Sequence, residues 1–149
     1  LVSASNTITG SVTVTGTGFY KRPARKRSSP AAGGTADGGT FPGGSWLAAA
    51  ALDRVHIPLQ VQEGERLGQV QLQVDPGGAV AGTMTVLRRD ASGVLTSLGT
   101  ATTAGAAFQT LTVTPSNSPG SANIQYYVQY EAAQSLDAVH GAWYLTDVP

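Results

Sequence analysis

The chain has 149 residues, a formal net charge of zero and no cysteine. This length fits one domain, and the missing cysteines exclude disulfides, zinc–thiolate sites and cysteine nucleophiles. The longest unbroken apolar run covers residues 46–52, which is too short to cross a bilayer. We therefore expect a single domain over residues 1–149 that is not embedded in a membrane.

Apolar and polar residues alternate along much of the chain, as in strands with one buried face. Pro58 lies within such a segment and lacks an N–H, so it should occupy a sheet edge or an unpaired position. Turn sequences rich in Gly, Pro and Asp separate the segments. This pattern is typical of an all-β fold, an antiparallel β-sandwich or jelly roll of about eight strands. The predicted strands are residues 7–15, 54–62, 69–74, 83–89, 94–102, 108–114, 123–131 and 139–148.

Residues 21–45 interrupt the alternation and are predicted to form a long polar, glycine-rich loop. Residues 1–27 carry a charge of +5, and residues 28–149 carry −5. We expect the start of the loop to bind an acidic surface on a neighbouring subunit. A solvated loop is the alternative, and nucleic acid is the least favoured partner because no aromatic residue is interleaved with the charges. The predicted partner-binding residues are Phe19, Tyr20, Lys21, Arg22, Arg25, Lys26 and Arg27.

No sequence motif for catalysis, metal binding or cofactor binding is recognisable. His56 and His140 each follow an aspartate by three positions, but residues three apart on a strand point to opposite faces. We interpret both as surface histidines. Glu63 and Glu65 have the residue type of a glycosidase pair, although a solvated turn is the favoured interpretation. We predict a protein that is not an enzyme and that needs no metal or cofactor.

Aromatic residues divide between predicted core and predicted surface. Tyr126, Tyr130 and Trp143 share strand faces with apolar residues, so all three are predicted to be buried. A candidate contact for a glycan or another subunit is formed by three residues on the opposite faces of their strands: Tyr127, His140 and Tyr144. Polar but uncharged faces suit packing against identical copies, and they carry Gln60, Gln62, Gln69, Gln71, Gln73, Gln125 and Gln129.

Residues 55–67 combine an Ile-Pro-Leu strand, a Glu-Gly turn and the start of another alternating strand. With this segment, the chain resembles β-sandwich domains of tailed-phage structural proteins and bacterial surface proteins over residues 10–148. The other matching motifs are residues 19–23, 83–90, 97–100 and 126–128. The resemblance implies a capsid decoration protein, or a tail-fibre or spike head, that is carried on the virion and forms trimers or symmetric arrays.

We therefore expect a non-enzymatic virion structural protein that decorates or cements a capsid or forms part of a tail appendage. Its expected partners are other copies of itself, as a trimer, and a capsid or tail protein. The alternative is a carbohydrate- or receptor-binding β-sandwich that uses Tyr127, His140 and Tyr144. A second alternative is a jelly-roll coat protein whose basic segment contacts nucleic acid.

Overall fold

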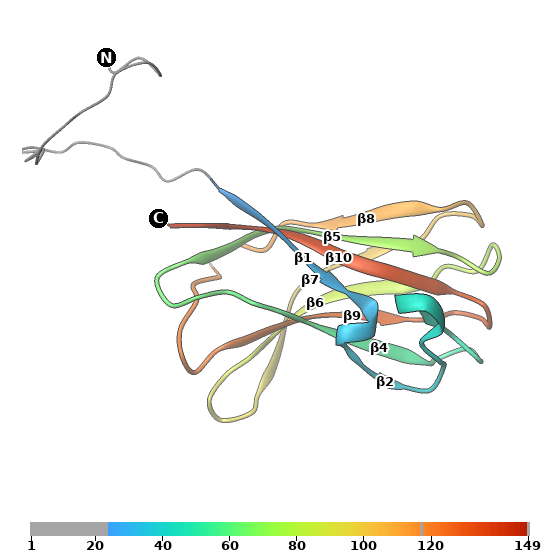
Figure 1. Cartoon of the computed structure of the whole chain (residues 1–149), viewed down its shortest axis with the longest axis horizontal. Coiled ribbons are helices and arrows are strands. Elements are labelled where there is room, and N and C mark those ends of the chain that lie inside the picture. The colour runs from blue at the N-terminus through green and yellow to red at the C-terminus, as the bar shows by residue number, and fades with distance from the viewer. Residues whose placement is uncertain (1–23, 117, 149) are drawn as a thin grey trace, which may run out of the picture.

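The computed structural model describes residues 24–116 and 118–148, and Figure 1 shows two facing β-sheets. The β10 sheet has the order β1-β10-β5-β8, with β3 also paired to β10, and the β9 sheet has the order β2-β4-β9-β6-β7. All these pairs are antiparallel, so the predicted β-sandwich is confirmed. The elements are β1 (Arg25–Pro30), η1 (Ala31–Gly33), β2 (Thr35–Asp37), η2 (Pro42–Gly44), β3 (Trp46–Leu47), β4 (Arg54–Leu59), β5 (Arg66–Asp75), β6 (Thr83–Arg89), β7 (Leu95–Thr102), β8 (Gln109–Val113), β9 (Gln125–Glu131) and β10 (Ala138–Asp147). No helix within the described ranges is long and apolar enough to cross a membrane.

The core lies between the sheets and is built from the inward residues of the alternating segments. Seven of the eight predicted strands are confirmed as β4 to β10, and the eighth, residues 7–15, lies outside the described residues. Tyr126 and Tyr130 are buried as predicted, and the Tyr130 hydroxyl donates to the Asp137 carboxylate at 3.0 Å. Burial and the Asp137 charge raise the pKa of Tyr130, so this hydroxyl remains a donor at neutral pH. The inward core residues include Val55, Ile57, Val70, Leu72, Val74, Met84, Val86 and Val128.

Pro58 occupies an unpaired position, as its missing N–H requires. β2 pairs with β4 only over residues 54–56, so it ends before Pro58. The Pro58 carbonyl accepts a hydrogen bond from the Ser29 hydroxyl at 3.0 Å. Because the N–H and C=O of one strand residue point to the same side, the missing N–H of Pro58 also faces away from β9.

The predicted loop over residues 21–45 is wrong from residue 25 onward, because this stretch contains the strands β1 and β2. β1 was missed because its sequence, Arg-Lys-Arg-Ser-Ser-Pro, has no apolar alternation. It is an edge strand that pairs only with β10, and most of its residues are exposed. Charged side chains on an edge strand also oppose pairing with further strands.

β10 departs from simple alternation, and this overturns two predictions. Its pairing with β5 shifts register between Val139 and Gly141, where β10 has an extra residue, and again between Tyr144 and Thr146. An extra residue inverts which side chains point inward. Trp143 is therefore 36% exposed and Tyr144 only 3% exposed, so the predicted burial of Trp143 and the predicted outward position of Tyr144 are wrong.

Two turns at the end of the sandwich opposite the C-terminus share the sequence Ala-Ala-x-x-Leu-Asp, residues 48–53 and 132–137 (Figure 1). They are joined by reciprocal backbone hydrogen bonds of 2.8–2.9 Å. The first alanine of each turn donates to the aspartate carbonyl of the other, and each leucine N–H donates to the other turn's first alanine. Leu52 and Leu136 both have φ of 70°, a left-handed conformation that is costly for leucine.

Candidate functional site

The predicted partner-binding cluster is divided by the fold. Phe19, Tyr20, Lys21 and Arg22 lie outside the described residues. Arg25, Lys26 and Arg27 lie on β1, where successive side chains point to opposite sides of the sheet. The structure therefore separates the roles of neighbouring basic residues within this strand.

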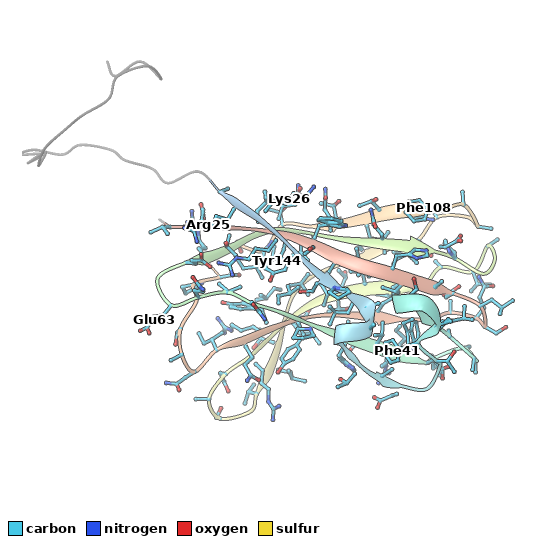
Figure 2. All side chains as sticks on the ribbon, in the orientation of Figure 1. Arg25, Lys26, Phe41, Glu63, Phe108 and Tyr144 are labelled. Atoms are coloured by element: carbon cyan, nitrogen blue, oxygen red, sulfur yellow. The ribbon has the colours of Figure 1, made fainter. Side chains whose placement is uncertain are left out.

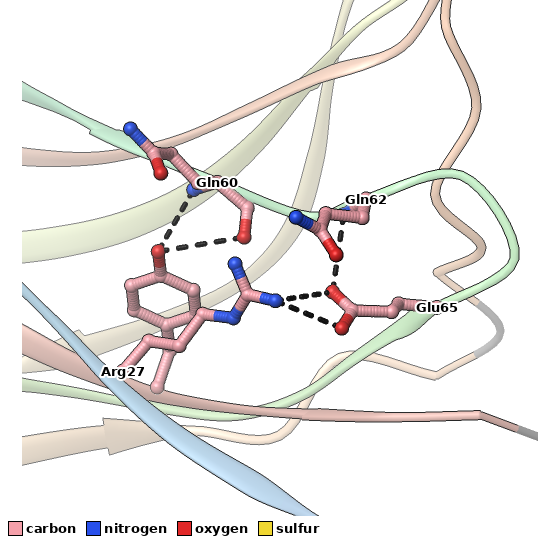
Figure 3. Close-up of polar contacts among 5 residues, drawn as sticks. Arg27, Gln60, Gln62 and Glu65 are labelled. Atoms are coloured by element: carbon pink, nitrogen blue, oxygen red, sulfur yellow. Dashed lines mark hydrogen bonds and ion pairs between the residues drawn. The ribbon is translucent and has the colours of Figure 1, made fainter.

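Arg27 points toward the turn that precedes β5. Its Nη2 donates to both carboxylate oxygens of Glu65, at 2.8 and 3.0 Å (Figure 3). The Glu65 carboxylate also accepts the Gln62 N–H at 3.1 Å, and Glu65 is only 7% exposed. The interpretation of residues 63–66 as a solvated turn is thus wrong for Glu65, while Glu63 is exposed at its tip (Figure 2).

Lys26 and Arg25 are both exposed, on opposite sides of β1. The Lys26 Nζ lies 4.8 Å from the ring centroid of Trp143, within the range of a cation–π interaction. Arg25 is exposed near the C-terminal end of β10 (Figure 2). Of the three basic residues on β1, Arg27 takes part in an ion pair within the fold, and Arg25 and Lys26 face solvent.

The structure does not bring Tyr127, His140 and Tyr144 together. Tyr127 lies on β9, whereas His140 and Tyr144 lie on β10 in the other sheet. The buried Tyr144 hydroxyl accepts the Gln60 N–H at 2.9 Å (Figure 3). These three residues cannot form one binding platform.

Both histidines lie on outer faces, as predicted. The His56 Nε2 is 3.0 Å from the Gln129 Oε1, and the His140 Nδ1 is 2.9 Å from the Ser45 hydroxyl. The His140 ring also lies 5.8 Å from the ring of Phe108. Within residues 24–116 and 118–148, no group of three or more His, Asp or Glu is placed to hold a metal ion.

The outer face of the β9 sheet carries a groove centred on Tyr127. Strand register places Pro58 and Leu87 on either side of Tyr127, so an apolar row crosses three strands. The next row along the strands contains His56, Gln129 and Thr85. This arrangement puts a flat apolar strip directly beside groups that donate and accept hydrogen bonds.

We call this surface the Tyr127 groove. Its main hollow has a volume of about 520 Å³ and is lined by Thr35, His56, Leu87, Arg89, Gly93, Leu95 and Tyr127. A second hollow of about 320 Å³ adjoins it, and Tyr127 lines both. Beyond the hydrogen-bonding row, Arg54 pairs with Glu131 at 2.6 Å, which neutralises the charge at that end.

The β6–β7 hairpin closes one side of the groove. The Asp90 carboxylate accepts the backbone N–H groups of Ser92 and Val94, each at 3.0 Å, and also the Ser92 hydroxyl. Gly93, which lines the groove, has φ of 84°. The turn at residues 90–93 is therefore held by its own hydrogen bonds beside the exposed Arg89.

Sequence reasoning identified Tyr127 as an outward residue but did not identify its neighbours. Alternation within β9 places Gln125 and Gln129 on the same face as Tyr127, and that signal is visible in the sequence. The positions of His56, Leu87 and Arg89 beside them depend on the register of β4 and β6 against β9. That register has no local sequence signal.

No protein-family profile and no curated protein sequence matches the chain. Among solved structures, it is similar to a low-affinity xylan-binding module, CBM86, from Roseburia intestinalis (18% identity, TM-score 0.52, 80% of this chain and 94% of that one). It is also similar to carbohydrate-binding module CBM36 in complex with calcium and xylotriose (13% identity, TM-score 0.52, 80% and 98%).

A third similar structure is the exo-β-1,3-galactanase of Phanerochaete chrysosporium, with 17% identity and a TM-score of 0.50. The match covers 81% of this chain but only 29% of the galactanase. At such low sequence identity these similarities establish the fold. The chain has the β-sandwich architecture of carbohydrate-binding modules.

Proposed function

We propose that this protein is a carbohydrate-binding β-sandwich that holds a polysaccharide in the Tyr127 groove. The observation that carries the proposal is the apolar row of Pro58, Tyr127 and Leu87 beside hydrogen-bonding side chains. The similarity to carbohydrate-binding modules supports the same class of function.

The apolar row suits the C–H-bearing face of a sugar ring. Tyr127 is only half-buried, so part of its ring is free to contact a ligand. Tyrosine combines a large apolar surface with a hydroxyl that needs a polar partner, and here that hydroxyl donates to Gln125. This bond orients the ring before a ligand arrives.

The polar rows suit the hydroxyl groups of a sugar. His56 and Gln129 are held by their mutual bond of 3.0 Å, which leaves each with further donor or acceptor capacity. Arg89 forms no ion pair within the described part of the chain. A few positioned polar groups within an apolar surface are the usual composition of a small-molecule site.

The groove favours binding over hydrolysis. Glycosidases generally use a pair of carboxyl groups on either side of the scissile bond, and none of the residues that line the two hollows is Asp or Glu. Glu131, at the end of the same face, is held by Arg54. We therefore propose that the protein binds a polysaccharide in this groove and does not hydrolyse it.

The test is affinity electrophoresis against xylan, a β-1,3-glucan and a β-1,3-galactan, followed by calorimetry with the polysaccharide that retards the protein. Tyr127→Ala should weaken binding roughly tenfold, because an aromatic contact contributes about 1 kcal/mol or more. Tyr127→Phe should retain most of the affinity.

Phe108→Ala is the matched control, since Phe108 is an exposed aromatic residue immediately before β8, which belongs to the other sheet. The proposal is contradicted if none of the three polysaccharides retards the protein, or if Tyr127→Ala leaves the binding unchanged.

The expectation of a virion structural protein receives no support from the similar structures, which are carbohydrate-binding modules or parts of glycosidases.

A further inference from the structure

A tryptophan is exposed on the outer face of the other sheet. Trp143 lies on β10, between β1 and β5, and is 36% exposed. Two register shifts flank the segment 141–144 that contains it. Bulges re-aim side chains and are over-represented beside functional sites, so this exposed Trp on an interior strand calls for a ligand-based explanation.

The surroundings of Trp143 are polar. Gln71 is its register partner on β5, and the Gln71 side chain donates to Gln69 at 3.2 Å. On the other side, the Lys26 Nζ lies 4.8 Å from the Trp143 ring centroid. We call this surface the Trp143 face; its hollow of about 130 Å³ is lined by Lys26, Gln69, Gln71, Trp143, Tyr144 and Leu145.

The Trp143 face has a cation that no carboxylate neutralises. None of its lining residues is Asp or Glu, and Lys26 forms no ion pair among the described residues. By contrast, Arg27 is committed to Glu65 at 2.8 Å and Arg66 to Asp147 at 2.9 Å. The Lys26 ammonium is thus free to attract an anion beside an aromatic ring.

We propose that the Trp143 face is a second carbohydrate site and that it takes an acidic sugar. The ring of a uronic acid unit packs on Trp143, and its carboxylate pairs with Lys26. The side-chain amides of Gln69 and Gln71 donate to and accept from the sugar hydroxyls. This site lies on the sheet opposite to the Tyr127 groove, so either site can fail without the other.

Other occupants fit the same face less well. A stable protein interface buries about 800 Å² on each partner around an apolar centre, whereas this face offers mainly glutamine and one exposed indole. Nucleic acid gains most of its affinity from several phosphate contacts. With Arg27 committed to Glu65, only Arg25 and Lys26 remain for such contacts on β1.

Tryptophan fluorescence of the full 149-residue chain tests the proposal, with a galacturonic acid oligomer as the probe. The chain has two tryptophans, and Trp46 is fully buried, so a change on binding reports Trp143. We expect a saturable change that weakens with added salt. Lys26→Gln, and methyl esterification of the oligomer, should each weaken binding about tenfold.

Lys26→Arg should keep the affinity because it keeps the charge, and Tyr127→Ala should leave uronate binding unchanged. Equal binding of the methyl ester, wild-type affinity of Lys26→Gln, or no saturable change would each overturn the proposal. A thymidine oligonucleotide that binds more tightly than the uronate would instead assign the face to nucleic acid. None of these outcomes affects the Tyr127 groove.

Discussion

The ion pair between Arg27 and Glu65 joins the edge strand β1 to the turn before β5, and its removal should destabilise the fold. The side chains of Arg27 and Glu65 are 19% and 8% exposed, and the two groups are 2.8 Å apart. In Arg27→Met, the Glu65 carboxylate keeps the Gln62 N–H at 3.1 Å as its only hydrogen-bond donor among the described residues. A carboxylate would then be nearly buried without a compensating charge.

Breaking a buried pair on one side costs about 3–5 kcal/mol. Because Arg27 is partly exposed, some water reaches the pair, and we expect a loss of about 2–3 kcal/mol in the free energy of unfolding. For a chain near 150 residues this corresponds to a fall in Tm of about 4–12 °C. Urea unfolding monitored by circular dichroism measures the first quantity, and a thermal scan measures the second.

Arg25→Met is the matched control, because Arg25 is an exposed arginine on the same strand and its loss should change stability by less than about 0.5 kcal/mol. Adding Glu65→Gln to Arg27→Met should recover part of the loss, since the buried charge is then absent. If Arg27→Met is no more destabilising than Arg25→Met, the reasoning from burial is refuted, and the basic cluster is a surface feature throughout.

Three further predictions concern single side chains that hold strands and turns of the fold in place. Tyr144→Phe should cost about 1 kcal/mol in urea unfolding, because the partly buried hydrogen bond from the Gln60 N–H to the Tyr144 hydroxyl is lost; a loss below about 0.5 kcal/mol contradicts this. Leu52→Asn should raise stability by about 0.5–1 kcal/mol, because asparagine tolerates a φ of 70° better than leucine, and the side chain is 68% exposed. A lower urea midpoint would show that the leucine side chain contributes to packing. Hydrogen bonds from the Ser92 hydroxyl and the Val94 N–H lower the pKa of Asp90, so its stabilisation is complete above the ordinary carboxyl pKa and is lost as pH falls through the lower folded value. Asp90→Asn should therefore flatten the pH dependence of unfolding between about pH 5 and pH 2, and an unchanged profile counts against this role.

The strands of the core could be predicted from the sequence because burial on one face requires period-two alternation. The runs that became β4, β5, β6, β8 and β9 carry apolar residues on one side and polar residues on the other, and the apolar side is buried. β7 is the exception, because it is a sheet-edge strand without a buried residue. The all-β class follows from these runs together with the glycine- and aspartate-rich turns between them. Pro58 could also be placed, since a missing N–H restricts a residue to few positions in a sheet.

β1 and the orientation of Trp143 could not be predicted for two different physical reasons. β1 is an exposed edge strand that pairs with β10 through its backbone, so its sequence needs no apolar alternation. In β10, one extra residue between Val139 and Gly141 inverts the alternation. That insertion depends on the partner strand and leaves no trace in the sequence of β10 itself.

The candidate binding surfaces depend on contacts between distant segments. Alternation along residues 123–131 is enough to predict that Tyr127 faces outward, and the basic residues near position 25 are plain in the sequence. The folded chain is needed to place His56 and Leu87 beside Tyr127, to pair Arg27 with Glu65, and to bring Lys26 next to Trp143. Cross-strand register and burial set these relations. Both result from packing the whole chain, because the partners are separated by tens of residues and no local pattern specifies them.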